Sequence, residues 1–119
     1  MKKQDCLRWA KALINGKHEK LRGRMSNSRN FNETPTAMCC LGVANEEFKV
    51  EGYERDRVDG AAFSLSKAKV FSRSNPQVFG LSCYTLNDGR PIVGQICLTH
   101  EQIGILLLLA IETGEYKNI

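Results

Sequence analysis

The stretch AMCCLGVA, residues 37–44, constrains the fold more than any other, because it is apolar, rich in small residues and set between two polar segments. Its apolar side chains continue at steps of three and four residues as far as Phe48, which predicts a helix that starts near Cys39 and ends near Val50. Gly42 in the first turn would let another backbone approach closely. We expect this segment to be the second helix of the fold.

The adjacent cysteines of this segment admit a chemical and a structural interpretation. Cys39 and Cys40 could act as a redox or metal-binding pair. Neighbouring side chains on a helix point about 100° apart, however, so they cannot easily share a metal or close an unstrained disulfide. Free cysteine is also among the residues most often buried. We therefore interpret both as small, buried hydrophobic residues.

An amphipathic helix is predicted over residues 4–15, where apolar side chains recur at helical spacing and the charged ones face water. Asn15 and Gly16 end it, since both tolerate the left-handed conformation that follows a last turn. Trp9 lies on the apolar face. A large aromatic side chain at such a position is expected to anchor the core.

A very apolar helix is predicted at the C-terminus. Thr99 and Gln102 have the spacing of a capping box, residues 103–111 are apolar almost all round, and Gly114 is the natural stop. A helix of this composition is buried centrally or shares an interface.

A β-hairpin is predicted over residues 78–98. Two β-prone segments, 78–86 and 92–98, flank the sequence Asn87-Asp88-Gly89, in which Asp-Gly supplies the positive φ angles of a tight turn. Asn87 and Asp88 could bind a ligand, but turn chemistry already accounts for them. Residues 51–78 show no clear period, so short strands and irregular loop both stay open.

Composition and cysteine usage narrow the class of protein. The 119 residues, 42% hydrophobic and 25% charged, fit one domain with a real core. Asp5, Arg8 and Lys11 interrupt the continuous apolar stretch that a signal peptide needs after its basic start. The apolar run 103–111 is shorter than the roughly 20 residues of a membrane span. We expect a cytoplasmic protein with no membrane partner. Five cysteines without paired spacing indicate reduced thiols, with no metal site and no cofactor.

Positive charge is concentrated in residues 1–30, which hold nine of the 17 Lys and Arg and a net charge of +7, against −3 for the rest. Such a surface can bind a phosphate backbone, although Trp9 is expected to face the core and leaves no stacking platform. A solvated helix face and loop is the simpler interpretation. The candidate binding residues are Lys11, Lys17, Lys20, Arg22, Arg24 and Arg29.

One histidine is placed where it could act as a base. His100 begins the C-terminal helix beside Glu101, and the helix dipole there lowers a histidine pKa. The sequence places no nucleophile or second acid near it, so we assign no catalytic residue and interpret His100 as a polar helix start.

Short sequence blocks follow one another in a recognisable order: a Trp and an Ala-Leu pair in the first helix, a Gly, a Cys-Cys-Leu-Gly-Val block, and a Leu-Asn-Asp block before the last helix. In this the chain resembles a family of small, mostly uncharacterised bacteriophage proteins. The matching residues are Trp9, Ala12, Leu13, Gly16, Cys39, Cys40, Leu41, Gly42, Val43, Gly80, Leu81, Leu86, Asn87, Asp88, Gln102 and Ile103. Where the family usually continues into a Leu and a Cys before an acid, this chain has Ala44-Asn45-Glu46, and residues 51–78 lie outside the resemblance. The resemblance implies a phage origin and an accessory role in the infected bacterium, and it brings no catalytic residues.

These observations predict a single α+β domain over residues 1–119, with N- and C-terminal helices packed on a small antiparallel sheet that includes the 78–98 hairpin. The expected function is non-enzymatic: a phage accessory protein that binds a host macromolecule, most simply a host protein, in host takeover or anti-defence. The alternative is a nucleic-acid-binding protein that uses the basic N-terminal third. A small-molecule sponge or enzyme, with a pocket near the Cys-Cys helix and His100, is a third interpretation, and the oligomeric state stays open.

Overall fold

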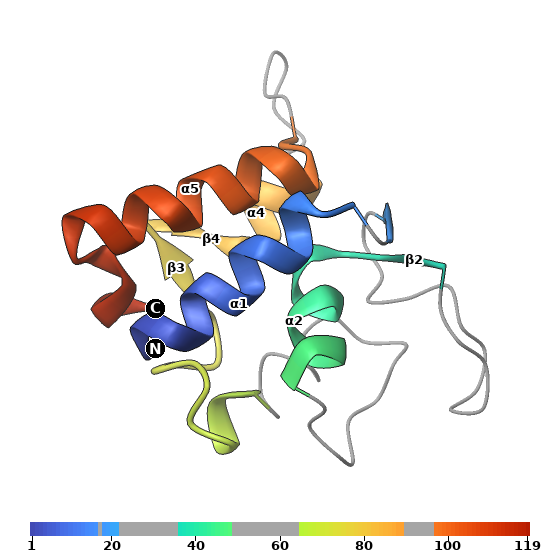
Figure 1. Ribbon diagram of the computed structural model, residues 1–119. Helices are drawn as coiled ribbons and strands as arrows, with labels where there is room; N and C mark the ends of the chain where they lie inside the picture. Colours follow the sequence, from blue (N-terminus) through green and yellow to red (C-terminus); the bar gives the residue numbers. More distant parts are fainter. Residues whose placement is uncertain (17, 22–35, 49–64, 90–96) are drawn as a thin grey trace.

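The computed structural model describes residues 1–16, 18–21, 36–48, 65–89 and 97–119. Their elements, in chain order, are α1 (Lys3–Ile14), β1 (Glu19–Lys20), β2 (Ala37–Met38), α2 (Cys40–Phe48), β3 (Gln77–Val78), β4 (Leu81–Ser82), α4 (Cys83–Asp88), α5 (His100–Thr113) and the 3₁₀ helix η1 (Glu115–Asn118). Helices α1 and α5 lie side by side, with α2 against α1 and the β3–β4 pair behind α5 (Figure 1). The two termini meet, since the amino group of Met1 donates to the carbonyl of Tyr116 at 3.0 Å.

Helix α1 forms as its amphipathic pattern predicts, one residue earlier at each end. Its buried face carries Cys6, Trp9, Ala10 and Leu13. The Trp9 ring is fully buried, packs 5.3 Å from the ring of Phe71, and donates from Nε1 to the Cys40 carbonyl at 2.9 Å. Trp9 is therefore a core anchor that also ties α1 to the first residue of α2.

Helix α5 confirms both of its predicted end signals. The Thr99 hydroxyl accepts from the Gln102 amide at 3.1 Å, and the Gln102 side chain accepts from the Thr99 amide at 2.9 Å. At the other end Gly114, with a φ of 82°, closes the helix in the left-handed conformation. The capping box and Gly114 therefore set the two ends of α5 through local interactions alone.

The fold class is α+β, with very little sheet. Strands β3 and β4 pair antiparallel with Val78 opposite Leu81, and β1 and β2 pair parallel with Glu19 opposite Ala37. Each of these strands has two residues, so the helices carry most of the core. The main contact of α5 is with α1, and it also touches β3.

The predicted hairpin over residues 78–98 is wrong in its first strand, because residues 83–88 form helix α4. The Ser82 hydroxyl accepts from the Thr85 amide at 3.2 Å and caps the helix, and Gly89, with a φ of 75°, ends it. The Asp-Gly sequence is thus a helix end instead of a hairpin turn. Residues 90–96, most of the predicted second strand, lie outside the described residues.

Candidate functional site at the Cys-Cys block

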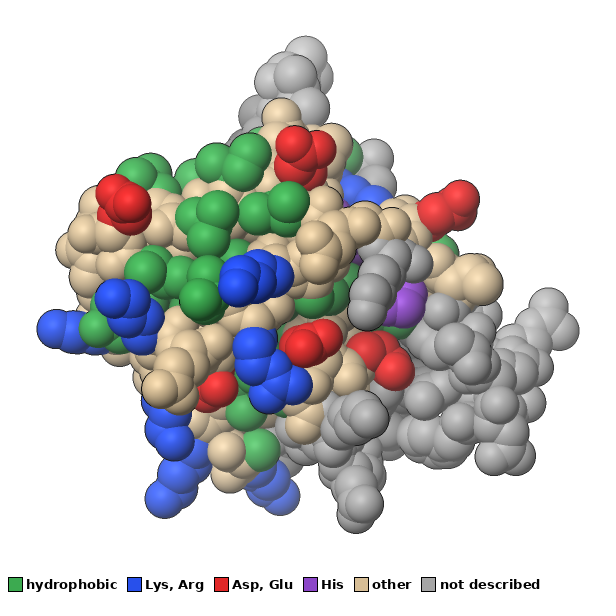
Figure 2. Space-filling view, viewed as in Figure 1, with side chains coloured by type: hydrophobic (Ala, Val, Ile, Leu, Met, Phe, Trp, Pro, Cys, Tyr) green, Lys and Arg blue, Asp and Glu red, His purple; other side chains and the backbone are tan. Residues whose placement is uncertain are grey.

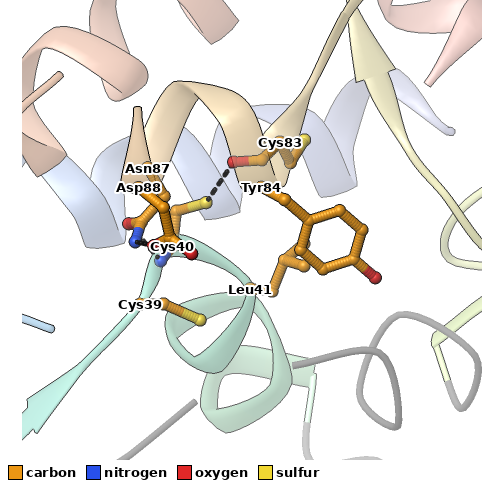
Figure 3. A pocket seen from close by; sticks show the side chains of 7 residues that line it. All are labelled: Cys39, Cys40, Leu41, Cys83, Tyr84, Asn87 and Asp88. Atoms are coloured by element: carbon orange, nitrogen blue, oxygen red, sulfur yellow. Dashed lines mark hydrogen bonds between the residues drawn. The ribbon is translucent and has the colours of Figure 1, made fainter. Parts of the chain in front are cut away.

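The start of α2 faces α4, and side-chain hydrogen bonds of Asn87 and Cys40 join the two helices (Figure 3). Asn87 of α4 is 1% exposed, and its Oδ1 accepts from the backbone amide of Cys40 at 3.0 Å. Its Nδ2 donates to the Leu21 carbonyl at 2.9 Å and to the Asp88 carboxylate at 2.7 Å. Asn87 therefore satisfies an otherwise orphaned amide at the start of α2 while binding the residue that follows β1. Its interpretation as a turn residue is wrong, because it acts across the fold.

Four thiols are buried around this junction. Cys40 Sγ donates to the Cys83 carbonyl at 3.6 Å, and Cys6 Sγ donates to the Leu107 carbonyl at 3.6 Å. Burial raises the pKa of Cys6 and Cys39 to about 11 and that of Cys83 to about 12, and it raises the pKa of Cys40 well above the usual value. These thiols are protonated at neutral pH, and a protonated thiol is a poor nucleophile and a poor metal ligand.

The hollow between α2 and α4 has no room for a water molecule. Its lining, drawn in Figure 3, consists of Cys39, Cys40, Leu41, Cys83, Tyr84, Asn87 and Asp88. Among the described residues, no three His, Cys, Asp or Glu side chains are placed to hold a metal ion. The Cys-Cys block, with Leu41 and Gly42 both buried, is thus packed against its neighbours and does not line an open site.

This burial predicts a pattern of thiol reactivity. With a thiol-specific reagent at about pH 8, we expect Cys6, Cys39, Cys40 and Cys83 to react at least about 100-fold more slowly in the native protein than in denaturant, because little thiolate forms and the reagent cannot enter. Labelled peptides quantified by mass spectrometry measure this, and the half-buried Cys97 is the internal reference. Labelling of Cys39 or Cys40 as fast as Cys97 would contradict the packing described here.

His100 is buried where the start of α5 approaches the β1–β2 pair. It is 7% exposed, and its Nε2 has no hydrogen-bond partner within the described part of the chain. Burial lowers its pKa, the positive charge of Lys20 lowers it further, and hydrogen bonding with the backbone of His18 and Met38 opposes both. The direction matches the expectation from the sequence, but the largest cause is burial and not the helix dipole. Such a ring is neutral at pH 7 and sheltered from solvent.

The structure describes two of the six candidate basic residues. Lys11 is exposed on α1, and Lys20 is half-buried in β1. The other four lie outside the described residues: Lys17, Arg22, Arg24 and Arg29. The basic-patch hypothesis therefore stays a prediction.

A neighbouring arginine that the sequence analysis did not select joins α1 to α2. Arg8 Nε lies 3.3 Å from Glu47 Oε1, its Nη2 donates to the Glu47 carbonyl at 2.8 Å, and its guanidinium lies 5.1 Å from the centre of the Phe48 ring. With Lys11, Ala12 and Asn15, Arg8 and Glu47 line a hollow of about 160 Å³. The contacts of Arg8 are accounted for by packing the end of α2 onto α1.

An exposed aromatic side chain lies at the β3–β4 turn, at a position that the sequence did not single out. Phe79 is 41% exposed and has a φ of 51°, and Gly80 follows with a φ of 78°. Leu81, the next residue, is 44% exposed. Positive φ at both central residues is the signature of a type I′ hairpin turn, where Asn-Gly is the usual sequence. The glycine was a usable signal, but the phenylalanine before it conceals the turn.

Comparison with protein-family models, with curated proteins and with solved structures finds no match to this chain. The fold defines it as a small α+β protein. None of the helices in the described ranges has the length and apolar character needed to cross a membrane.

Proposed function

We propose that this protein is a phage accessory protein that acts without catalysis, by binding a host protein in the bacterial cytoplasm during host takeover or anti-defence. The observation that carries the proposal is the exposed phenylalanine at the β3–β4 turn. The resemblance to small phage proteins supports the proposed role in an infected bacterium. The raised thiol pKa values and the burial of His100 favour binding over catalysis at these residues.

Phe79 occupies a backbone conformation that opposes its side chain. A residue with a Cβ in the left-handed region costs about 1–2 kcal/mol, and a bulky residue there is an outlier. The ring of Phe79 stays 41% exposed, so a large part of its surface is free to contact a partner. Backbone strain at an exposed position commonly serves binding, and aromatic side chains are the most frequent anchors of protein interfaces. We therefore assign Phe79 to contact with a partner.

The turn that carries Phe79 is held in place from both sides. Its amide donates to Glu115 Oε1 at 3.1 Å, and Glu115 Oε2 accepts from Asn118 Nδ2 at 3.0 Å. Val78, before the turn, is 1% exposed and belongs to the core. A turn whose backbone is already held loses less conformational entropy when it binds. The fitting partner is a protein surface with an apolar pocket for the Phe79 ring and an apolar rim for Leu81.

Phe79→Asn should separate binding from stability. Asparagine tolerates the left-handed conformation, and this relief of strain offsets the loss of the partly buried ring. We therefore expect the free energy of unfolding to change by less than about 1 kcal/mol while binding to the host protein is lost. The matched control Phe79→Tyr keeps the aromatic ring and should still bind the host protein. Unfolding in urea measures stability, and quantitative affinity capture from a bacterial extract, followed by direct titration of the captured protein, measures binding. A Phe79→Asn protein that binds as tightly as the native chain, or one destabilised by several kcal/mol, would contradict the proposal.

The same preparation tests nucleic-acid binding as the alternative. When a protein neutralises several phosphates of duplex DNA, the logarithm of its binding constant falls linearly with the logarithm of the salt concentration. The slope is about −0.9 for each phosphate contact. Sub-micromolar binding at about 150 mM salt, abolished by changing Lys20, Arg22 and Arg24 to Glu, would favour the alternative. Weak binding that is lost at that salt concentration favours a protein partner.

A further inference from the structure

An apolar surface lies on the opposite side of α5 from the β3–β4 hairpin, where α5 and α1 run side by side. Leu7 of α1 is 37% exposed, and Ile105 and Leu109 of α5 are 53% and 48% exposed. Figure 2 shows hydrophobic side chains gathered over α5 and along its junction with α1. Ile14 and Leu108 add half-buried aliphatic surface between them. Apolar side chains gathered on one face mark an interaction site.

The charges that border this surface differ in sign between the two helices. Lys3 and Lys11 lie four residues before and after Leu7, so one stripe of α1 reads basic, apolar, basic. Glu101 and Glu112 bracket the exposed aliphatic side chains of α5, so that stripe reads acidic, apolar, acidic. All four charged side chains are exposed. In Figure 2 acidic side chains lie towards both ends of α5 and basic ones lie over α1.

We propose that two copies of this chain associate through this face, with the α5 stripe of each copy against the α1 stripe of the other. A two-fold axis that lies in the plane of the face and parallel to α5 makes this exchange, because it brings the acidic edge of one copy onto the basic edge of its partner. At 1.5 Å per residue the two lysines are about 12 Å apart along α1 and the two glutamates about 16 Å apart along α5. The spans are similar enough for both ends to pair.

The pattern selects a second copy over an unrelated protein. An interface around a two-fold axis must be complementary to itself, so a face that carries both signs on separate edges meets its requirement. A partner attracted by charge alone would need only one sign. In the proposed dimer the aliphatic side chains at the centre supply the affinity, and the Lys–Glu edges set the orientation.

Charge reversal and re-pairing test the proposal. The native chain should sediment at twice the 13.4 kDa monomer mass at a concentration of about 100 µM. We expect the double variants Lys3→Glu/Lys11→Glu and Glu101→Lys/Glu112→Lys each to be monomeric, because like charges then meet at both edges. An equimolar mixture of the two should restore a dimer that contains one copy of each. Lys69→Glu/Arg73→Glu changes the net charge as the lysine variant does, at exposed residues outside this face, and should stay dimeric.

Each result decides for or against the dimer. A monomeric native chain, a charge-reversed variant that stays dimeric, or a mixture that does not re-pair would overturn it. Circular dichroism identifies a variant that has not folded. In that case Ile105→Gln, at a side chain 53% exposed, replaces it and should raise the dissociation constant at least tenfold. The proposal is independent of the Phe79 surface, so Phe79→Asn should leave the dimer intact.

Discussion

Leu107→Asp is expected to leave the chain unfolded at room temperature. Leu107 is fully buried at the centre of α5, and its carbonyl accepts the Cys6 thiol from α1 at 3.6 Å. An aspartate there loses the apolar contacts of the leucine and buries a carboxylate without a partner, at a cost of several kcal/mol. Small domains are stable by about 5–15 kcal/mol, so this one change removes most or all of the stability.

Two control variants separate burial from a general effect of substitution in α5. Leu107→Met keeps the volume apolar and should cost less than about 1.5 kcal/mol. Ile105→Asp places the same charge on the exposed side of the same helix and should cost about 1 kcal/mol or less in dilute solution. Circular dichroism at 222 nm during thermal unfolding measures all three. If the Leu107→Asp protein had the native melting temperature, the placement of α5 in the core would be wrong.

Gly104→Leu should destabilise the protein by about 3 kcal/mol, although leucine favours a helix over glycine by roughly 0.8 kcal/mol. A Cβ at Gly104 would lie 2.6 Å from Ile14 Cγ1 and 2.9 Å from the Ala10 carbonyl oxygen. The Ile14 side chain can turn away, but the carbonyl belongs to the backbone of α1. The two helices would have to separate, and their contact is the most extensive one between elements of the described residues.

A double-mutant cycle identifies the cause of this loss. In an Ile14→Ala background, Gly104→Ala should cost less than it does in the native chain, because one of the two close contacts is gone. The destabilisation by Gly104→Ala that remains in the Ile14→Ala background measures the close contact with the Ala10 carbonyl oxygen. Urea unfolding of the four proteins gives the free energies. If Gly104→Leu were more stable than the native chain, as propensity alone predicts, the close approach of α1 and α5 would be refuted.

The three long helices were predictable because their signals are local. In α1 and α5 the apolar period, the glycine ends and the capping box of Thr99 and Gln102 each involve residues within one or two turns of each other. The burial of Trp9, Cys39 and Cys40 followed in the same way from residue type and local sequence position. In such segments local preference and tertiary packing agree.

Residues 83–88 show where local preference was insufficient. The segment is β-prone and ends in the Asp of an Asp-Gly pair, yet the Ser82 cap and the burial of Cys83, Leu86 and Asn87 on one side make it a helix. Strand preference depends on what the strand packs against, and here α2 and the residue after β1 supply hydrogen-bond partners that only a helical Asn87 is placed to meet. No spacing within the segment reports those distant partners.

By itself, the sequence determined which segments form the three long helices, where α5 begins and ends, and which faces of α1 and α5 are apolar, since adjacent residues decide these features. The tertiary structure alone decided that Asn87 joins α2 to α4, that Gly104 admits the backbone of α1, and that Phe79 stands exposed in a strained turn. Each of these three depends on atoms brought together from segments far apart in the chain, or on a backbone angle that the neighbouring strands impose. Such relations arise only when the chain has folded.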